Sequence, residues 1–117
     1  MELPDISKYI NQKEILQQTL AGINRGFMQI GEQEIIAEQN EPTFETLINA
    51  LCPVLENLYH NKHQLFQALM YKIDISEKML NNAIEKPGKD LLKEVAVLVV
   101  KRELQKTISR NFYKKQH

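Results

Sequence analysis

The feature that most constrains this chain is an unbroken apolar run, Val95 to Val100, which leads directly into a regular helical pattern. From Val100 the apolar residues recur every fourth position, at Leu104, Ile108 and Phe112, as on one face of a helix. Valine favours strands, but no turn residue follows the run and the helical period continues through it. The pattern therefore predicts one long helix rather than a buried strand.

This helix is predicted over residues 90–114. Pro87 and Gly88 separate it from the preceding element, and Asp90 is a good N-cap because its carboxylate can accept hydrogen bonds from the first turn. The first half of the helix is apolar all round, and such a helix is normally buried on every side. We therefore expect the rest of the chain to be organised around it.

A second helix is predicted over residues 12–30, with an apolar stripe formed by Leu16, Leu20, Ile23, Phe27 and Ile30. Asn11 and Glu14 suit a loose capping box, and Gly31 suits a C-cap. Small residues follow the edge of the stripe at Thr19, Gly22 and Gly26. They indicate either a close approach by another helix or a frayed or bent segment, since each glycine costs a helix about 1 kcal/mol.

Two further helices are predicted over residues 43–72 and 75–86. Thr43 caps the first of them, and Pro53 inside it should produce a kink near residues 49–51. A further break near His60 and Asn61 is compatible with the sequence. Asp74 and Glu77 form a capping-box pattern that opens the shorter helix.

These patterns predict an all-α fold with one domain over residues 1–117. The architecture is expected to be an irregular up-down bundle of about four main helices, the second of them kinked, because the connections are mostly short. Residues 1–11 form an arm with a short turn near Ile6 to Ile10. The acidic segment 32–41 is interpreted as a short helix, although a linker is the alternative.

Charge is distributed unevenly along a chain that is neutral as a whole. Residues 1–60 hold 3 basic and 9 acidic residues, whereas residues 61–117 hold 12 basic and 6 acidic residues. Either the two halves neutralise each other by packing together, or the second half presents a basic surface to nucleic acid or to an acidic partner.

The compartment is inferred from the single cysteine and from the apolar runs. Cys52 has no partner for an internal disulfide, which favours a reducing compartment. The first residues are not basic and lead into no apolar signal core. No apolar run approaches the roughly 20 residues of a membrane-spanning helix. We therefore expect a cytoplasmic protein without a membrane segment.

One set of possible metal ligands shares a helix face at spacings of four, four and three: Cys52, Glu56, His60 and His63. That face lies opposite the apolar residues of the same helix, so it should meet solvent. The spacing also differs from the Glu-x-x-His pattern of di-iron bundles. We therefore expect no metal site and no cofactor.

Catalytic motifs are missing as well. The sequence contains no glycine-rich phosphate loop and no serine in a nucleophile elbow. Its carboxylates follow solvated patterns, with no pair inside an apolar face. We therefore expect no catalytic residues and no enzymatic activity.

Basic residues on the last helix also recur every fourth position, two residues out of phase with the apolar stripe: Arg102, Lys106, Arg110 and Lys114. They should lie nearly opposite that stripe, on the solvent side. Such a basic stripe suits contact with phosphates, and Phe112 and Tyr113 could stack on bases. Phe112 also belongs to the apolar face, however, which favours a core position for it.

Three hypotheses for function follow. The favoured one is a non-enzymatic interaction protein that forms a homodimer, because the outer side of the apolar run needs cover and a two-fold axis would bring the run against itself. Val97 or Leu98 would then lie near the centre of the interface. The alternative is a nucleic-acid-binding accessory protein that uses the basic stripe. The third is a metal-binding or enzymatic helical bundle.

Overall fold

The structure is a computed structural model that describes residues 6–32, 41–85 and 90–116, with the side chains of the last helix described through Tyr113. All the regular secondary structure in the described part is helical, which confirms the all-α prediction. Its elements are a 3-10 turn, η1 (Ile6–Lys8), and the helices α1 (Lys13–Gln29), α2 (Phe44–Asn61), α3 (His63–Ile73), α4 (Glu77–Ile84) and α5 (Leu91–Gln116).

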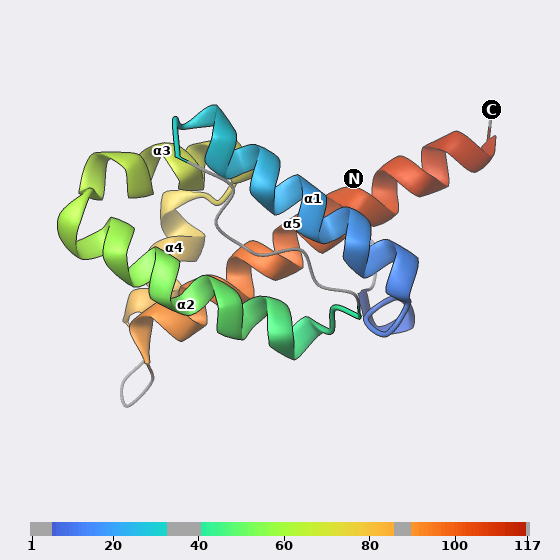
Figure 1. The fold of residues 1–117 in the computed structure, drawn as a ribbon, viewed down its shortest axis with the longest axis horizontal. Helices are drawn as coiled ribbons and strands as arrows, with labels where there is room; N and C mark the ends of the chain where they lie inside the picture. Colours follow the sequence, from blue (N-terminus) through green and yellow to red (C-terminus); the bar gives the residue numbers. More distant parts are fainter. Residues whose placement is uncertain (1–5, 33–40, 86–89, 117) are drawn as a thin grey trace.

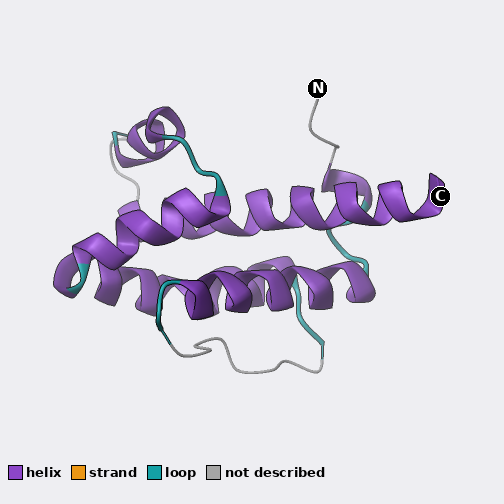
Figure 2. Cartoon of the chain, turned by 90° about the horizontal axis from the view of Figure 1, so that it is seen from above, coloured by secondary structure: helices purple, strands orange, loops and turns teal. Residues whose placement is uncertain are grey.

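Helix α5 is the element that all the others contact. It packs against α1, α2, α3, α4 and η1 (Figure 1). In Figure 2, η1 lies beside the C-terminal part of α5, and the far end of α5 extends beyond the other helices. Four residues of the apolar run, Val95, Ala96, Val99 and Val100, are fully buried. The prediction of a helix through this run is therefore confirmed, whereas burial on every side is incomplete, because Val97 and Leu98 are only partly buried.

The core has a large part and a small part. The large part joins α1, α2, α3 and the first half of α5, with Phe27, Leu51, Phe66 and Val99 among its fully buried side chains. The small part lies under η1, where Ile15, Leu104 and Ile108 meet the half-buried Ile6 and Tyr9. The N-terminal turn expected near Ile6 thus covers the second half of the α5 apolar stripe.

Several predicted caps are present. Asp90 Oδ1 accepts hydrogen bonds from the backbone N–H groups of Leu92 (3.1 Å) and Lys93 (3.3 Å). Thr43 caps α2, since its hydroxyl oxygen accepts the N–H of Thr46 at 3.0 Å. Gly31 follows α1 with a φ of 85°, the left-handed conformation that suits glycine at this position.

Two predicted caps are wrong. The residue before α1 is Gln12 rather than Asn11, and its side chain makes no capping bond. Helix α4 is capped by Ser76, whose Oγ accepts the N–H of Met79 at 3.1 Å. Asp74 instead closes α3 in the left-handed region, with a φ of 66°. The N–H of Ile75 donates to the carbonyl of Met70 across that turn, which satisfies a helix end that would otherwise be open.

The single kinked helix predicted over residues 43–72 is two helices, so the part of the chain that the structure describes has five helices rather than four. Pro53 lies inside α2, which continues past it to Asn61. The chain breaks at Lys62, where φ is −140° and ψ is 56°. The break deprives the Tyr59 carbonyl of its next helical donor, and His63 Nδ1 lies 3.0 Å from that oxygen. The ring of His63 thereby supplies the donor that the helix break removes.

The short helix predicted for the acidic segment 32–41 falls mainly on residues 33–40, which lie outside the described residues. Glu32, at its start, is described. Its carboxylate pairs with Lys62 at 2.9 Å and is largely covered, with 17% of its side chain exposed. Lys62, which lies between α2 and α3, therefore also holds the chain that follows α1 through its ion pair with Glu32.

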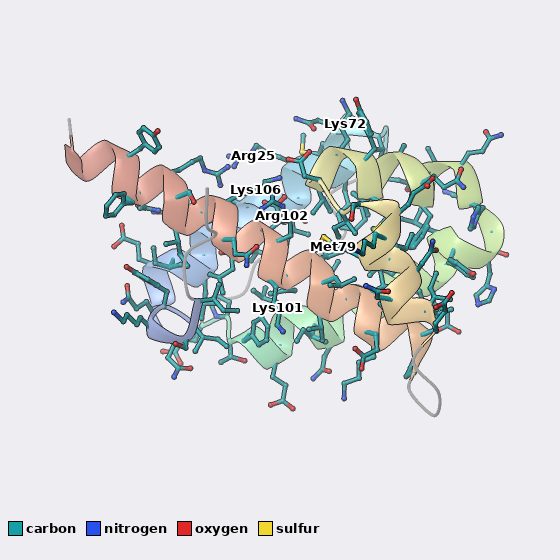
Figure 3. All side chains as sticks on the ribbon, turned by 180° about the vertical axis from the view of Figure 1, so that it is seen from behind. Arg25, Lys72, Met79, Lys101, Arg102 and Lys106 are labelled. Carbon is teal, nitrogen blue, oxygen red and sulfur yellow. The ribbon has the colours of Figure 1, made fainter. Side chains whose placement is uncertain are left out.

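Replacement of Leu104 by alanine tests the predicted phase of α5. Leu104 has no exposed surface, so Leu104→Ala is expected to lower the free energy of unfolding by about 2–5 kcal/mol. The control is Lys101→Ala on the same helix, where the side chain is exposed (Figure 3). It should change stability by less than about 0.5 kcal/mol. Denaturant unfolding of both variants measures the difference, and equal losses would contradict this packing of α5.

Candidate anion-binding site

The basic stripe of α5 does not form a uniformly solvated face. The side chains of Arg102 and Lys106 are only 21% and 24% exposed. Arg110 is exposed, and the side chain of Lys114 lies outside the described part of the chain. The middle of the stripe is half-buried because α1 and α3 both pack against α5 on that side.

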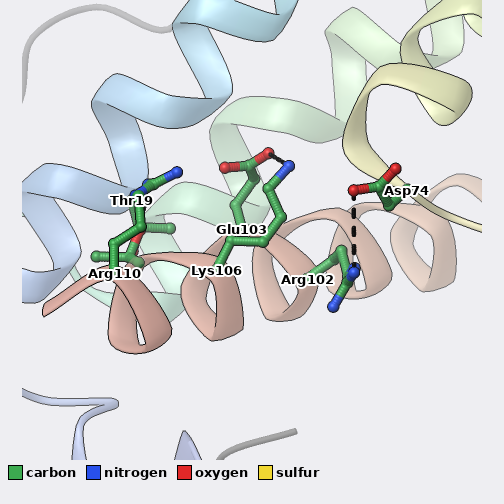
Figure 4. A network of polar contacts seen from close by, with 7 residues as sticks. Thr19, Asp74, Arg102, Glu103, Lys106 and Arg110 are labelled. Carbon is green, nitrogen blue, oxygen red and sulfur yellow. Dashed lines mark hydrogen bonds and ion pairs between the residues drawn. The ribbon is translucent and has the colours of Figure 1, made fainter. Parts of the chain in front are cut away.

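A buried carboxylate that the sequence did not reveal lies beside this stripe. Glu103 is 3% exposed, and its Oε1 accepts an ion-paired hydrogen bond from Lys106 Nζ at 2.8 Å (Figure 4). Removing an unpaired carboxylate from water is costly, so the lysine offsets a large part of that cost. Lys106 therefore has a structural partner, which contradicts its expected position as a freely solvated residue. In the sequence, only the spacing of three residues between Glu103 and Lys106 indicated this ion pair. The same spacing is common on exposed helix faces, so it did not reveal that Glu103 is buried.

The small residues of α1 provide the space for this carboxylate. A β-carbon at Gly22 would lie 2.6 Å from Oε2 of Glu103, so only a hydrogen fits there without displacing the carboxylate. One turn earlier, the Thr19 hydroxyl lies 3.4 Å from the Thr107 hydroxyl of α5. Of the two interpretations of these small residues, the close approach of another helix is thus confirmed.

Four cations surround a pocket of about 180 Å³ beside Glu103. They come from three helices: Arg25 of α1, Lys72 of α3, and Lys106 and Arg110 of α5. Gly22, Gly26, Gln29 and Glu103 complete the lining. Figure 3 views the molecule from the side on which Arg25, Lys72 and Lys106 appear together. The sequence predicted the contribution of α5, but the partners from α1 and α3 are far from it in the chain.

The ion pairs of this region leave the pocket with a surplus of positive charge. Among the described residues that line the pocket, Glu103 is the one carboxylate, against four cations. At the neighbouring end, Asp74 lies 3.9 Å from Arg102 and is 65% exposed (Figure 4). The guanidinium of Arg110 donates to the Thr107 hydroxyl at 3.3 Å, which orients it over α5. Arginine and lysine groups held in this way suit the recognition of phosphate oxygens.

Both aromatic residues near the end of α5 are exposed. Phe112 and Tyr113 each expose 59% of their surface. The prediction that Phe112 belongs to the core is therefore wrong, because the small core cluster ends at Ile108 and α5 continues past its neighbours (Figure 1). Phe112 instead lines a separate pocket of about 190 Å³ with Tyr9 and Ile15.

The four possible metal ligands are not brought together. His63 begins α3, on the other side of the helix break from Cys52, Glu56 and His60. Both histidine rings pack edge-on against Tyr59, with ring centroids 5.0 Å and 5.3 Å apart. Among the residues that the structure describes, no group of three His, Cys, Asp or Glu side chains is arranged to hold a metal ion.

Cys52 is partly buried in α2. Burial raises the pKa of its thiol, the carboxylate of Asp90 raises it further, and Lys93 acts in the opposite direction. A raised pKa keeps the thiol protonated near neutral pH, and a protonated thiol is a poor nucleophile and a poor ligand. The surroundings of Cys52 therefore do not activate it.

The residues expected at a dimer interface are only partly open. Val97 and Leu98 are both partly buried and pack against the large core. Helix α4 contacts α5 and, with Leu80 in the same cluster, covers part of the outer side that a second chain was expected to cover. Dimerisation through Val97 or Leu98 stays a prediction, and the apolar run requires less additional cover than the sequence suggested.

Comparison of the chain with protein-family models, with curated proteins and with solved structures finds no significant match. Among the described helices, none combines the length and the apolar character needed to cross a bilayer.

Two glycines of α1 offer a matched test of the Glu103 packing. Glycine to alanine in a helix normally gains up to about 1 kcal/mol. Gly26→Ala should show this gain, because its new methyl group would meet Leu69 and Ile73 at ordinary contact distances of 3.5 and 3.9 Å. Gly22→Ala should raise the free energy of unfolding by less than Gly26→Ala, because its methyl group displaces the Glu103 carboxylate from Lys106.

The two substitutions are compared by denaturant unfolding in the unmodified chain and in a Glu103→Ala background. With the carboxylate removed, the difference between the two sites should disappear. Equal changes in the free energy of unfolding for Gly22→Ala and Gly26→Ala in the unmodified chain would show that the Glu103 carboxylate does not need a glycine at position 22.

Proposed function

We propose that this chain is a non-enzymatic binding protein whose basic pocket holds the phosphate backbone of a nucleic acid. The observation that carries the proposal is the meeting of four cations from three helices around one pocket: Arg25, Lys72, Lys106 and Arg110. The described residues of its lining include a single carboxylate, Glu103. Each of these groups alone would be an ordinary surface charge. Their convergence is typical of surfaces that bind phosphate groups.

The arrangement of the cations supports this function energetically. Lys106 is fixed by Glu103 at 2.8 Å and Arg110 by Thr107 at 3.3 Å. Side chains that are already ordered lose less conformational entropy on binding, so more of the electrostatic attraction appears as affinity. The described residues of the pocket lining also carry a net charge of about +3, because they include four cations and one carboxylate.

The salt dependence of binding tests the proposal. If all four cations contact phosphates, the slope of log K against log salt should be about −3.6 on duplex DNA and about −2.8 on single strands. Arg25→Glu and Lys72→Glu should each weaken binding to all sequences alike, because both residues contribute charge from outside α5. Both side chains are exposed, so the substitutions should leave the fold intact.

The matched control is Lys93→Glu, which makes the same charge change at an exposed position on α5. Lys93 lies 13 residues before Lys106, or about 20 Å along the helix, and should affect binding little. Lys106 itself is unsuitable for charge reversal because it pairs with buried Glu103. Binding that ignores salt, or that falls equally in the Lys93 control, would exclude the pocket as the site.

A second candidate function is self-association as a homodimer, supported by the incomplete burial of Val97 and Leu98 in an otherwise buried run. A two-fold axis through this part of α5 would bury these side chains against their copies. Either function is compatible with a cytoplasmic protein, which is supported by the single cysteine, Cys52, because it has no partner for an internal disulfide.

Light scattering at increasing protein concentration tests the dimer. We expect a dimer at micromolar concentration, and Asp in place of whichever of Val97 and Leu98 lies outward should give a folded monomer. Helical circular dichroism of the variant separates loss of the dimer from loss of the fold. A monomer for the unmodified chain at high concentration would rule out this candidate and leave α4 as the cover of the apolar run.

A further inference from the structure

The cations of the pocket continue along α5 toward an exposed aromatic ring. Tyr113 lies seven residues after Lys106 and three after Arg110. Seven residues of an α-helix bring a side chain back to within about 20° of its starting direction. Tyr113 therefore extends the line of Lys106 and Arg110, about one helical turn beyond the pocket. Its ring is 59% exposed on the part of α5 that projects past the other helices (Figure 1).

The neighbouring Phe112 provides a contrast within the same turn. It is also 59% exposed, but it lines the other pocket with Tyr9 and Ile15 rather than the pocket of the four cations. Of the two exposed rings at this end of α5, Tyr113 is thus the one aligned with the positive charge.

Resting on the proposed function, we propose that the ligand of this surface is single-stranded nucleic acid and that Tyr113 stacks on an unpaired base while the pocket cations hold the adjoining phosphates. A ring next to a cationic groove is the arrangement by which proteins bind single strands without sequence preference. Inside a duplex both faces of each base are covered by neighbouring bases, so an exposed ring gains nothing there.

Titration of the full chain with three polyanions tests this proposal. The probes are a labelled single strand of about ten thymidines, which falls within the usual site sizes, a duplex of the same length, and inorganic polyphosphate of similar charge. The single strand should bind more tightly than the duplex. Tyr113→Ala should weaken binding of the single strand by roughly 5- to 150-fold, the effect of losing one stacked base.

Tyr113→Phe should retain the affinity, because phenylalanine keeps the stacking surface, and Phe112→Ala should change it little. Polyphosphate has no bases, so Tyr113→Ala should leave its binding unchanged. That measurement also shows that the variant remains folded.

The outcomes separate this proposal from the proposed function. Loss of binding in Arg25→Glu without any loss in Tyr113→Ala would keep the basic pocket as a phosphate site and overturn stacking. Equal losses in Tyr113→Ala and Phe112→Ala, or tighter binding of the duplex, would overturn stacking as well. Failure of all three polyanions to bind would overturn both proposals.

Discussion

The fold depends on covering the apolar run of one helix, α5, and most of this run is fully buried. The run from Val95 to Val100 leaves α5 without a polar face in its first half, so a single neighbouring helix cannot cover it. The chain meets this demand with α1, α2, α3 and α4, all of which contact α5. The packing of the other helices around α5 thus removes most of its apolar run from water.

The second half of α5 is held by a different kind of contact. Here α1 meets α5 through polar and small residues, with Thr19 against Thr107 and Gly22 against Glu103. Further along, the Asn111 amide donates to the Gln18 side chain at 2.6 Å. These contacts fix the register of the two helices, because each polar group requires its particular partner. The same close approach brings Arg25 of α1 into reach of the basic side of α5.

The sequence predicted what depends on local pattern and missed what depends on distant partners. The central helix, its cap at Asp90 and the burial of Leu104 follow from periodicity and capping chemistry. The break at Lys62 was only an open alternative near His60 and Asn61, because the residues on both sides of it continue the same apolar phase. The exposure of Phe112 also escaped prediction, since periodicity identifies a face of a helix but not where the neighbouring helices end.

The sequence predicted only part of the basic pocket, because the other part depends on residues that are distant in the chain. The contribution of α5 is a regular stripe, whereas Arg25 and Lys72 are single cations on helices with other patterns. Glu103 could not be distinguished from a solvated glutamate, because its burial depends on the glycine 81 positions earlier, at Gly22.

The position of Glu103 also explains how four like charges can be held together in the free protein. Cations that share one pocket repel each other, and this repulsion opposes the compact state. The buried carboxylate offsets part of it at Lys106, at the cost of its own desolvation and of a glycine in α1. Complete neutralisation would remove the positive charge of the pocket. A single internal carboxylate offsets only part of it, so the described residues of the pocket keep a surplus of positive charge.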